Sequence, residues 1–63
     1  MPDISWEDPY CGEGNSCFRV GTDSADNAYI AVNGAEDYYV TDSREALRTL
    51  IRDIKAGKAD HLL

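Results

Sequence analysis

Only one segment of this chain, residues 42–57, has the apolar periodicity of an amphipathic helix. Its apolar side chains recur at spacings of three and four residues, which places them on one helix face. They are Leu47, Leu50, Ile51 and Ile54. A single helix must therefore supply whatever cover the rest of the chain needs, and this requirement constrains the fold more than any other feature.

The ends of this helix carry recognisable signals. Asp42 is the expected N-cap, and Glu45 three residues later completes a capping-box pair. Gly57 is the expected C-terminal stop, and residues 58–63 follow as a fraying tail. One flank carries a row of arginines four residues apart, which we expect to be exposed: Arg44, Arg48 and Arg52.

Three short runs before the helix, residues 17–20, 28–32 and 38–41, resemble strands. Phe18 and Val20 alternate with Arg19, the pattern of a half-buried strand. In the later runs we expect one face to hold Ala28, Ile30 and Val32, and the core to receive Tyr38 and Val40. Asn33-Gly34 is a strong hairpin signal. Residues 35–37 either extend the third strand or widen this turn.

These elements predict one α+β domain spanning residues 1–63. We expect an irregular N-terminal arm (1–16), a three-stranded antiparallel β-meander (17–41), a C-terminal helix packed on one face of the sheet (42–57), and the tail. An antiparallel sheet normally buries one face, and the helix is the only element that can cover it. A chain of 63 residues has little stability unless a disulfide, a metal or oligomerisation adds to it.

The charge of the chain is divided unevenly. The net charge is −6, but residues 1–42 carry −8, with Arg19 as their one basic residue, and residues 43–63 carry +2. An acidic chain is repelled by phosphate backbones, so we expect no direct contact with nucleic acid and a protein partner with a basic surface. The alternative is that acidity only maintains solubility. Without a signal peptide or membrane span, the expected location is the cytoplasm.

The two cysteines do not form a familiar metal or redox motif. Cys11 and Cys17 are separated by five residues, and the single histidine, His61, lies in the tail. A closed zinc site needs four ligands, so we predict no metal site. We expect Cys17 to be a small buried hydrophobe and Cys11 to be exposed, with a disulfide between them only incidental in oxidised protein. A metal- or redox-responsive domain using both cysteines remains an alternative.

Catalytic arrangements are equally hard to find. His61 has no positioned partner for nucleophilic catalysis. Gly12 and Gly14 resemble the start of a phosphate-binding loop, but a strand follows them and none precedes them. We therefore predict a non-enzymatic protein with no catalytic residue and no cofactor.

The stretch WEDPYCGEGNSCFRV, residues 6–20, resembles the opening signature of the domain of unknown function 397 family, small actinobacterial proteins of the BldB and WhiJ-associated type. Seven positions match it in order and nearly in spacing: Trp6, Tyr10, Gly12, Gly14, Asn15, Cys17 and Val20. The close of the chain, IKAGKAD at 54–60, resembles the end of the same family. Cys11 stands where the family has serine, Arg19 where it usually has glutamate, and residues 32–35 replace its V-R-D-S segment.

The resemblance implies a role beside helix-turn-helix regulators of the Xre type, in developmental or antitoxin-like control of transcription. It supplies no catalytic residues. For contact with such a regulator we expect the acidic pair Glu36 and Asp37, and the alternative contact is the row Arg44, Arg48 and Arg52. A third alternative is a small homo-oligomer in which a sheet edge or helix face pairs with itself.

Overall fold

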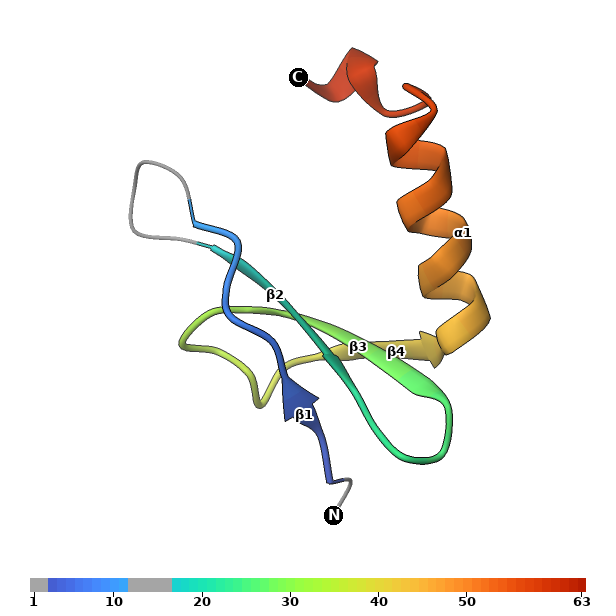
Figure 1. The fold of residues 1–63 in the computed structure, drawn as a ribbon. Coiled ribbons are helices and arrows are strands. Elements are labelled where there is room, and N and C mark those ends of the chain that lie inside the picture. Colours follow the sequence, from blue (N-terminus) through green and yellow to red (C-terminus); the bar gives the residue numbers. More distant parts are fainter. Residues whose placement is uncertain (1–2, 12–16) are drawn as a thin grey trace.

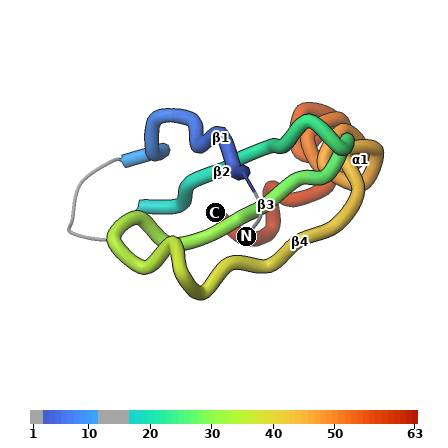
Figure 2. The backbone as a smooth tube through the Cα atoms, turned by 90° about the horizontal axis from the view of Figure 1, so that it is seen from below, coloured from blue at the N-terminus to red at the C-terminus, as the bar shows by residue number. Residues whose placement is uncertain are grey.

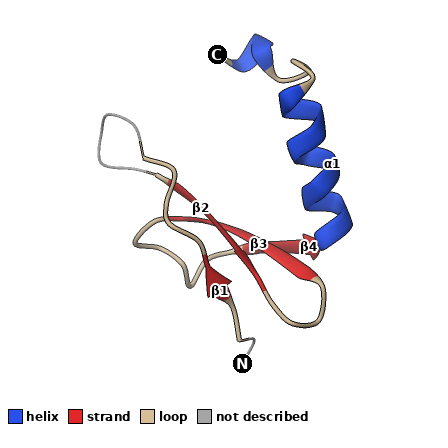
Figure 3. Cartoon of the chain, in the orientation of Figure 1, coloured by secondary structure: helices blue, strands red, loops and turns tan. Residues whose placement is uncertain are grey.

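A computed structural model describes residues 3–11 and 17–63 of the chain. Four strands form one antiparallel sheet in the order β1-β2-β3-β4, and a helix follows (Figures 1 and 3). The elements are β1 (Ser5–Trp6), β2 (Phe18–Thr22), β3 (Asn27–Val32), β4 (Val40–Ser43), α1 (Arg44–Lys55) and the 3-10 helix η1 (Asp60–Leu62). The α+β class is confirmed, but the expected three-stranded meander is a four-stranded sheet.

The additional strand comes from the arm that the sequence predicts to be irregular. β1 pairs with β2, with Trp6 opposite Gly21. Beyond β1 the arm stays beside β2, because the amide of Glu7 donates to the carbonyl of Val20 (2.8 Å) and the amide of Tyr10 to that of Phe18 (2.8 Å). Two residues are too few for period-2 alternation to be visible, so this strand has no sequence pattern of its own.

The connection between β3 and β4 is wider than a two-residue hairpin. Gly34 has φ +90°, in the region that favours glycine, and the amide of Ala35 donates to the carbonyl of Val32 (2.9 Å). Residues 35–37 therefore widen the turn. The strand expected at residues 38–41 is β4, which begins at Val40, two residues later than expected. Tyr38 precedes it and is 86% exposed. The prediction that Tyr38 faces the core is wrong.

The sheet packs on the face opposite to the one that apolar alternation suggests. The strand register places Gly21, Tyr29 and Ala31 on one face, which we call the aromatic face. Trp6 lies 6.4 Å from Tyr29 between ring centroids, and Tyr39 lies 5.0 Å from Tyr29 in an edge-to-face contact. Tyr29 and Ala31 are both buried. Aromatic rings bury more area than aliphatic side chains, so they determine which face becomes the core.

The opposite face of the sheet, which we call the open face, is largely uncovered. Its members are Phe18, Val20, Ile30, Val32 and Val40. Phe18 and Val40 are each 67% exposed, so the expectation that Val40 faces the core is also wrong. Ala28 lies on the same side of the sheet but is buried, because the start of α1 lies over that end.

The helix begins one residue later than expected. Ser43 is its N-cap and accepts a hydrogen bond from the amide of Ala46 (3.1 Å). Asp42, the expected cap, instead accepts a hydrogen bond from the amide of Ser43. At the other end Gly57 has φ +86° and follows the C-cap, which confirms it as the stop. The tail then forms η1.

Helix α1 covers only one end of the open face. It rises at a steep angle from the end of β4, and Figure 2 views it nearly along its axis (Figures 1 and 2). Ala46, Leu47 and Leu50 meet the sheet, yet no residue of α1 is buried. The expected packing of the helix on a face is therefore limited to its first turns. None of the helices in residues 3–11 and 17–63 combines the length and apolarity that a membrane crossing requires.

Candidate interaction surface

The open face presents apolar side chains where a two-layer protein normally presents polar ones. Val20, Ile30 and Val40 form a row across three strands, and Phe18 and Val32 form the next row. Phe18 and Val40 are 67% exposed, and Val32 is 40% exposed. Contiguous apolar exposure of this kind is typical of a surface that binds another molecule.

The helix continues this surface. Leu50, Ile51 and Ile54 are 44%, 48% and 51% exposed, so the apolar stripe predicted from the sequence exists but is about half exposed along most of its length. Where α1 meets the sheet, an open groove of about 320 Å³ is lined by Ala28, Ile30, Val40, Thr41, Asp42, Ser43, Ala46, Leu47 and Leu50. We call the open face together with the stripe of α1 (Leu47, Leu50, Ile51 and Ile54) the apolar surface.

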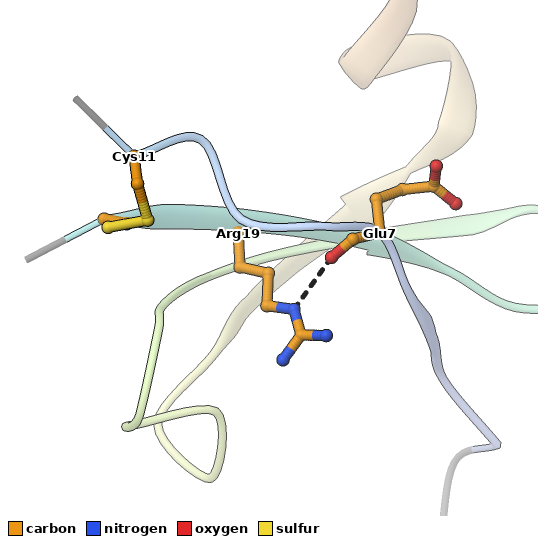
Figure 4. Close-up of a disulfide and its surroundings, with 4 residues drawn as sticks. Glu7, Cys11 and Arg19 are labelled. Atoms are coloured by element: carbon orange, nitrogen blue, oxygen red, sulfur yellow. Dashed lines mark hydrogen bonds between the residues drawn. A yellow bond between two sulfur atoms is a disulfide. The ribbon is translucent and has the colours of Figure 1, made fainter.

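A second feature lies around Arg19, on the aromatic side of β2. Its Nε donates to the carbonyl of Glu7 (2.8 Å), and one of its terminal nitrogens donates to a carboxylate oxygen of Glu36 (2.9 Å). Figure 4 shows the guanidinium turned toward the backbone of Glu7. Arg19 therefore joins the arm to the β3–β4 connection, two segments far apart in the sequence.

Two acidic pairs lie on the two segments that Arg19 joins, although the carboxylate of Glu7 points away from the guanidinium (Figure 4). Glu7 and Asp8 come from the arm, and Glu36 and Asp37 come from the β3–β4 connection. We call these four residues the acidic cluster. Glu7, Asp8 and Asp37 are exposed, so their carboxylates face solvent.

Glu36 differs from the other three members of the acidic cluster. Its side chain and that of Arg19 each retain 26% of their exposure in the ion pair. The hydrogen bond from Arg19, with further bonds from the backbone amides of Glu36 and Gly34, holds the pKa of Glu36 below its ordinary value. The structure thus gives Glu36 a structural role, whereas Asp37 remains free to meet a partner.

The arginine row occupies the flank of α1 beside the apolar stripe. Arg44, Arg48 and Arg52 are all exposed, as expected. A terminal nitrogen of Arg48 lies 3.8 Å from a carboxylate oxygen of Glu45, at the limit of an ion pair. Because both side chains are largely solvated, this contact adds little stability. The row is therefore available as a basic edge.

A network around Asp23, which sequence analysis missed, fixes the β2–β3 turn. One oxygen of its carboxylate accepts from the amides of Ala25 (2.9 Å) and Asn27 (3.0 Å), and the other accepts from the hydroxyl of Tyr29 (2.6 Å). The bond from Tyr29, followed by those from Asn27, lowers the pKa of Asp23 to about 2. The same contact raises the pKa of Tyr29. An aspartate at the start of a polar turn is the signal that indicates such a network.

The cysteines are joined. Cys11 and Cys17 form a disulfide, with their Cα atoms 4.7 Å apart (Figure 4). Cys17 is 9% exposed and Cys11 is exposed, as the sequence predicts. Within the described part of the chain, no three His, Cys, Asp or Glu side chains converge as a metal site would require.

The residues of the opening signature lie in different environments. Trp6 and Val20 are half-buried and Cys17 is buried, whereas Tyr10 is 69% exposed at the bridge to Phe18. Gly12, Gly14 and Asn15 lie outside the described residues. A comparison of the chain with protein-family models, with curated proteins and with solved structures finds no significant match.

Proposed function

We propose that this chain is a non-enzymatic accessory protein that binds a helix-turn-helix transcription regulator through the acidic cluster and modulates it in the manner of an antitoxin. The observation that carries the proposal is the junction at Arg19. The one basic residue of residues 1–42 is neutralised there by Glu36, so the cluster presents carboxylates without a competing cation.

The chemistry of the expected partner fits this arrangement. A helix-turn-helix regulator offers a basic surface to phosphate groups. Exposed carboxylates can occupy such a surface in place of DNA, and charge opposite to that of the partner accelerates association. The resemblance of residues 6–20 to the domain of unknown function 397 family supports a regulator as the partner, and the cytoplasm as the place of action.

The disulfide favours a second candidate function, a redox-responsive domain. The Cys11–Cys17 disulfide ties the arm, which carries half of the acidic cluster, to the residue that precedes β2. Thiols of cytosolic proteins are kept reduced, so formation of this bond would distinguish two states of the arm. In this function, the redox state of the cysteine pair would change the position of the arm and thereby the binding of a partner to the acidic cluster.

The test uses the purified helix-turn-helix regulator encoded closest to this gene and a fluorescent duplex of its operator. Addition of the protein should release the duplex, which is measured as a fall in fluorescence anisotropy. The variant Glu7→Lys with Asp37→Lys should lose this effect. The control Asp3→Lys with Asp60→Lys changes the net charge equally at positions outside the cluster and should retain it. Equal activity of both variants would contradict the proposed site.

A further inference from the structure

The folded chain exposes more surface than a monomer of its mass should. Its accessible surface is 5089 Å² for a mass of 7.0 kDa, whereas the scaling for monomeric proteins gives roughly 4,000 Å². The excess of roughly 1,000 Å² is comparable with the roughly 800 Å² that each partner buries in a standard protein interface.

The core of the described chain is correspondingly small. Its buried hydrophobic residues are Cys17, Ala28, Tyr29 and Ala31, and no described side chain is less than 2% exposed. Chains of this size commonly gain the missing burial by association. The apolar side chains needed for it, on the open face and along α1, are already in place.

The two halves of the apolar surface, the stripe of α1 and the open face of the sheet, are bordered by opposite charges. The stripe of α1 is flanked by cations, namely Arg44, Arg48, Arg52 and Lys55. The sheet is bordered by exposed carboxylates in the β2–β3 turn, the β3–β4 connection and the edge strand, namely Asp26, Asp37 and Asp42. The outer part of the stripe, Ile51 and Ile54, does not line the chain's own groove, so it is free to contact a sheet in another molecule.

We infer that the occupant of the apolar surface is a second copy of this chain. Two molecules associate around a two-fold axis, and the outer half of each α1 lies on the open face of the other molecule. Ile51 and Ile54 of one molecule then cover Phe18 and Val40 of its partner, and the basic flank of the helix meets the acidic border of the sheet. A two-fold arrangement places each helix on the sheet of the other molecule, so both the stripe of α1 and the open face are covered in both molecules. This inference does not depend on the proposed function.

The first measurement needs only the unmodified protein. Sedimentation equilibrium over a series of concentrations should give twice the 7.0 kDa of the chain, with a dissociation constant of about 10 μM or tighter for an interface of this size. A mass that remains monomeric to about 100 μM would overturn the inference.

Variants then test the reciprocal arrangement. Ile51→Glu with Ile54→Glu changes the helix half, and Phe18→Glu with Val40→Glu changes the sheet half. Each variant alone should be monomeric, with circular dichroism showing that it remains folded. Their equimolar mixture should form mixed dimers, because one unmodified helix still meets one unmodified sheet.

Tyr38→Glu is the matched control, since Tyr38 is 86% exposed but belongs to neither half, and it should dimerise like the parent protein. Failure of the two monomeric variants to associate on mixing would overturn the reciprocal contact. So would dimers of the sheet variant alone, because they would require contact between two helices.

Discussion

Gly21 lies under the indole ring of Trp6, and a Cβ atom at position 21 would stand 2.8 Å from Cε3 of that ring and 2.7 Å from Cγ2 of Ile4. Real Cβ atoms do not approach other heavy atoms this closely. The absence of a side chain at position 21 of β2 is therefore what allows Ile4 and Trp6 to pack there. The ring of Trp6 also packs near that of Tyr29, so this contact places Trp6 in the core on the aromatic face.

Gly21→Ala should lower the free energy of unfolding by about 1–3 kcal/mol, since the added methyl group must displace a packed ring. Urea denaturation measures the loss. In a Trp6→Ala background the same substitution should cost less, with a coupling energy of at least about 0.5 kcal/mol. Additive effects of the two substitutions would contradict the contact.

Trp6→Ala should itself cost about 2 kcal/mol. This is less than the roughly 3–5 kcal/mol expected for a fully buried ring, because Trp6 is only half-buried at the edge of the sheet. Tryptophan fluorescence should shift to longer wavelength during unfolding of the parent protein. A loss below about 0.5 kcal/mol would mean that the arm does not pack on the sheet.

Part of this fold follows from local sequence and part does not. The helix, its glycine stop and the exposed arginine row are local features, and the structure confirms them. The choice of sheet face is not local, because both faces of β3 carry apolar side chains. It depends on the fit between Trp6 and Gly21, which are fifteen positions apart. The choice between Asp42 and Ser43 as helix cap depends on where β4 ends.

The candidate sites divide in the same way. Asp37 and the arginines could be identified as exposed charges from the sequence. Arg19 could not be recognised as the residue that links the backbone of Glu7 to the carboxylate of Glu36, since that requires the register of the sheet. The exposure of the apolar surface does not follow from the sequence, because neither the strand alternation nor the length of the helix shows how far the helix covers the sheet.

Stability should fall in acid because of Asp23. Its pKa is about 2 in the folded protein against an ordinary value of 3.8, so the folded state binds the proton more weakly than the unfolded state. The stabilisation is complete above about pH 4 and is lost as the pH falls toward 2. Urea midpoints measured from pH 5 to 2 should show this decline.

Tyr29→Phe should flatten this dependence, because the hydroxyl of Tyr29 makes the largest contribution to the lowered pKa. Tyr38→Phe is the matched control, since Tyr38 is exposed, and it should keep the parent profile. An unchanged profile for Tyr29→Phe would show that the Asp23–Tyr29 bond does not contribute.

The disulfide should stabilise the oxidised protein. Closing so short a loop restricts the unfolded chain by about 2 kcal/mol, and Cys11→Ser should remove this contribution without disturbing the buried Cys17. Under reducing conditions the variant and the parent protein should unfold at the same urea concentration.

Native mass spectrometry of protein prepared with zinc should show no stoichiometric metal, and a bound zinc ion would favour the metal-responsive alternative.

The most direct test of the account is titration calorimetry of this protein against the helix-turn-helix regulator encoded closest to it. Binding should weaken from low to physiological salt, because it depends on attraction between charges. Binding should also be lost in the variant Glu7→Lys with Asp37→Lys. Loss only in a variant that replaces Arg44, Arg48 and Arg52 with glutamate would move the contact to α1. No binding by the parent protein at about 50 μM, corresponding to an affinity weaker than about 6 kcal/mol, would contradict the proposed function.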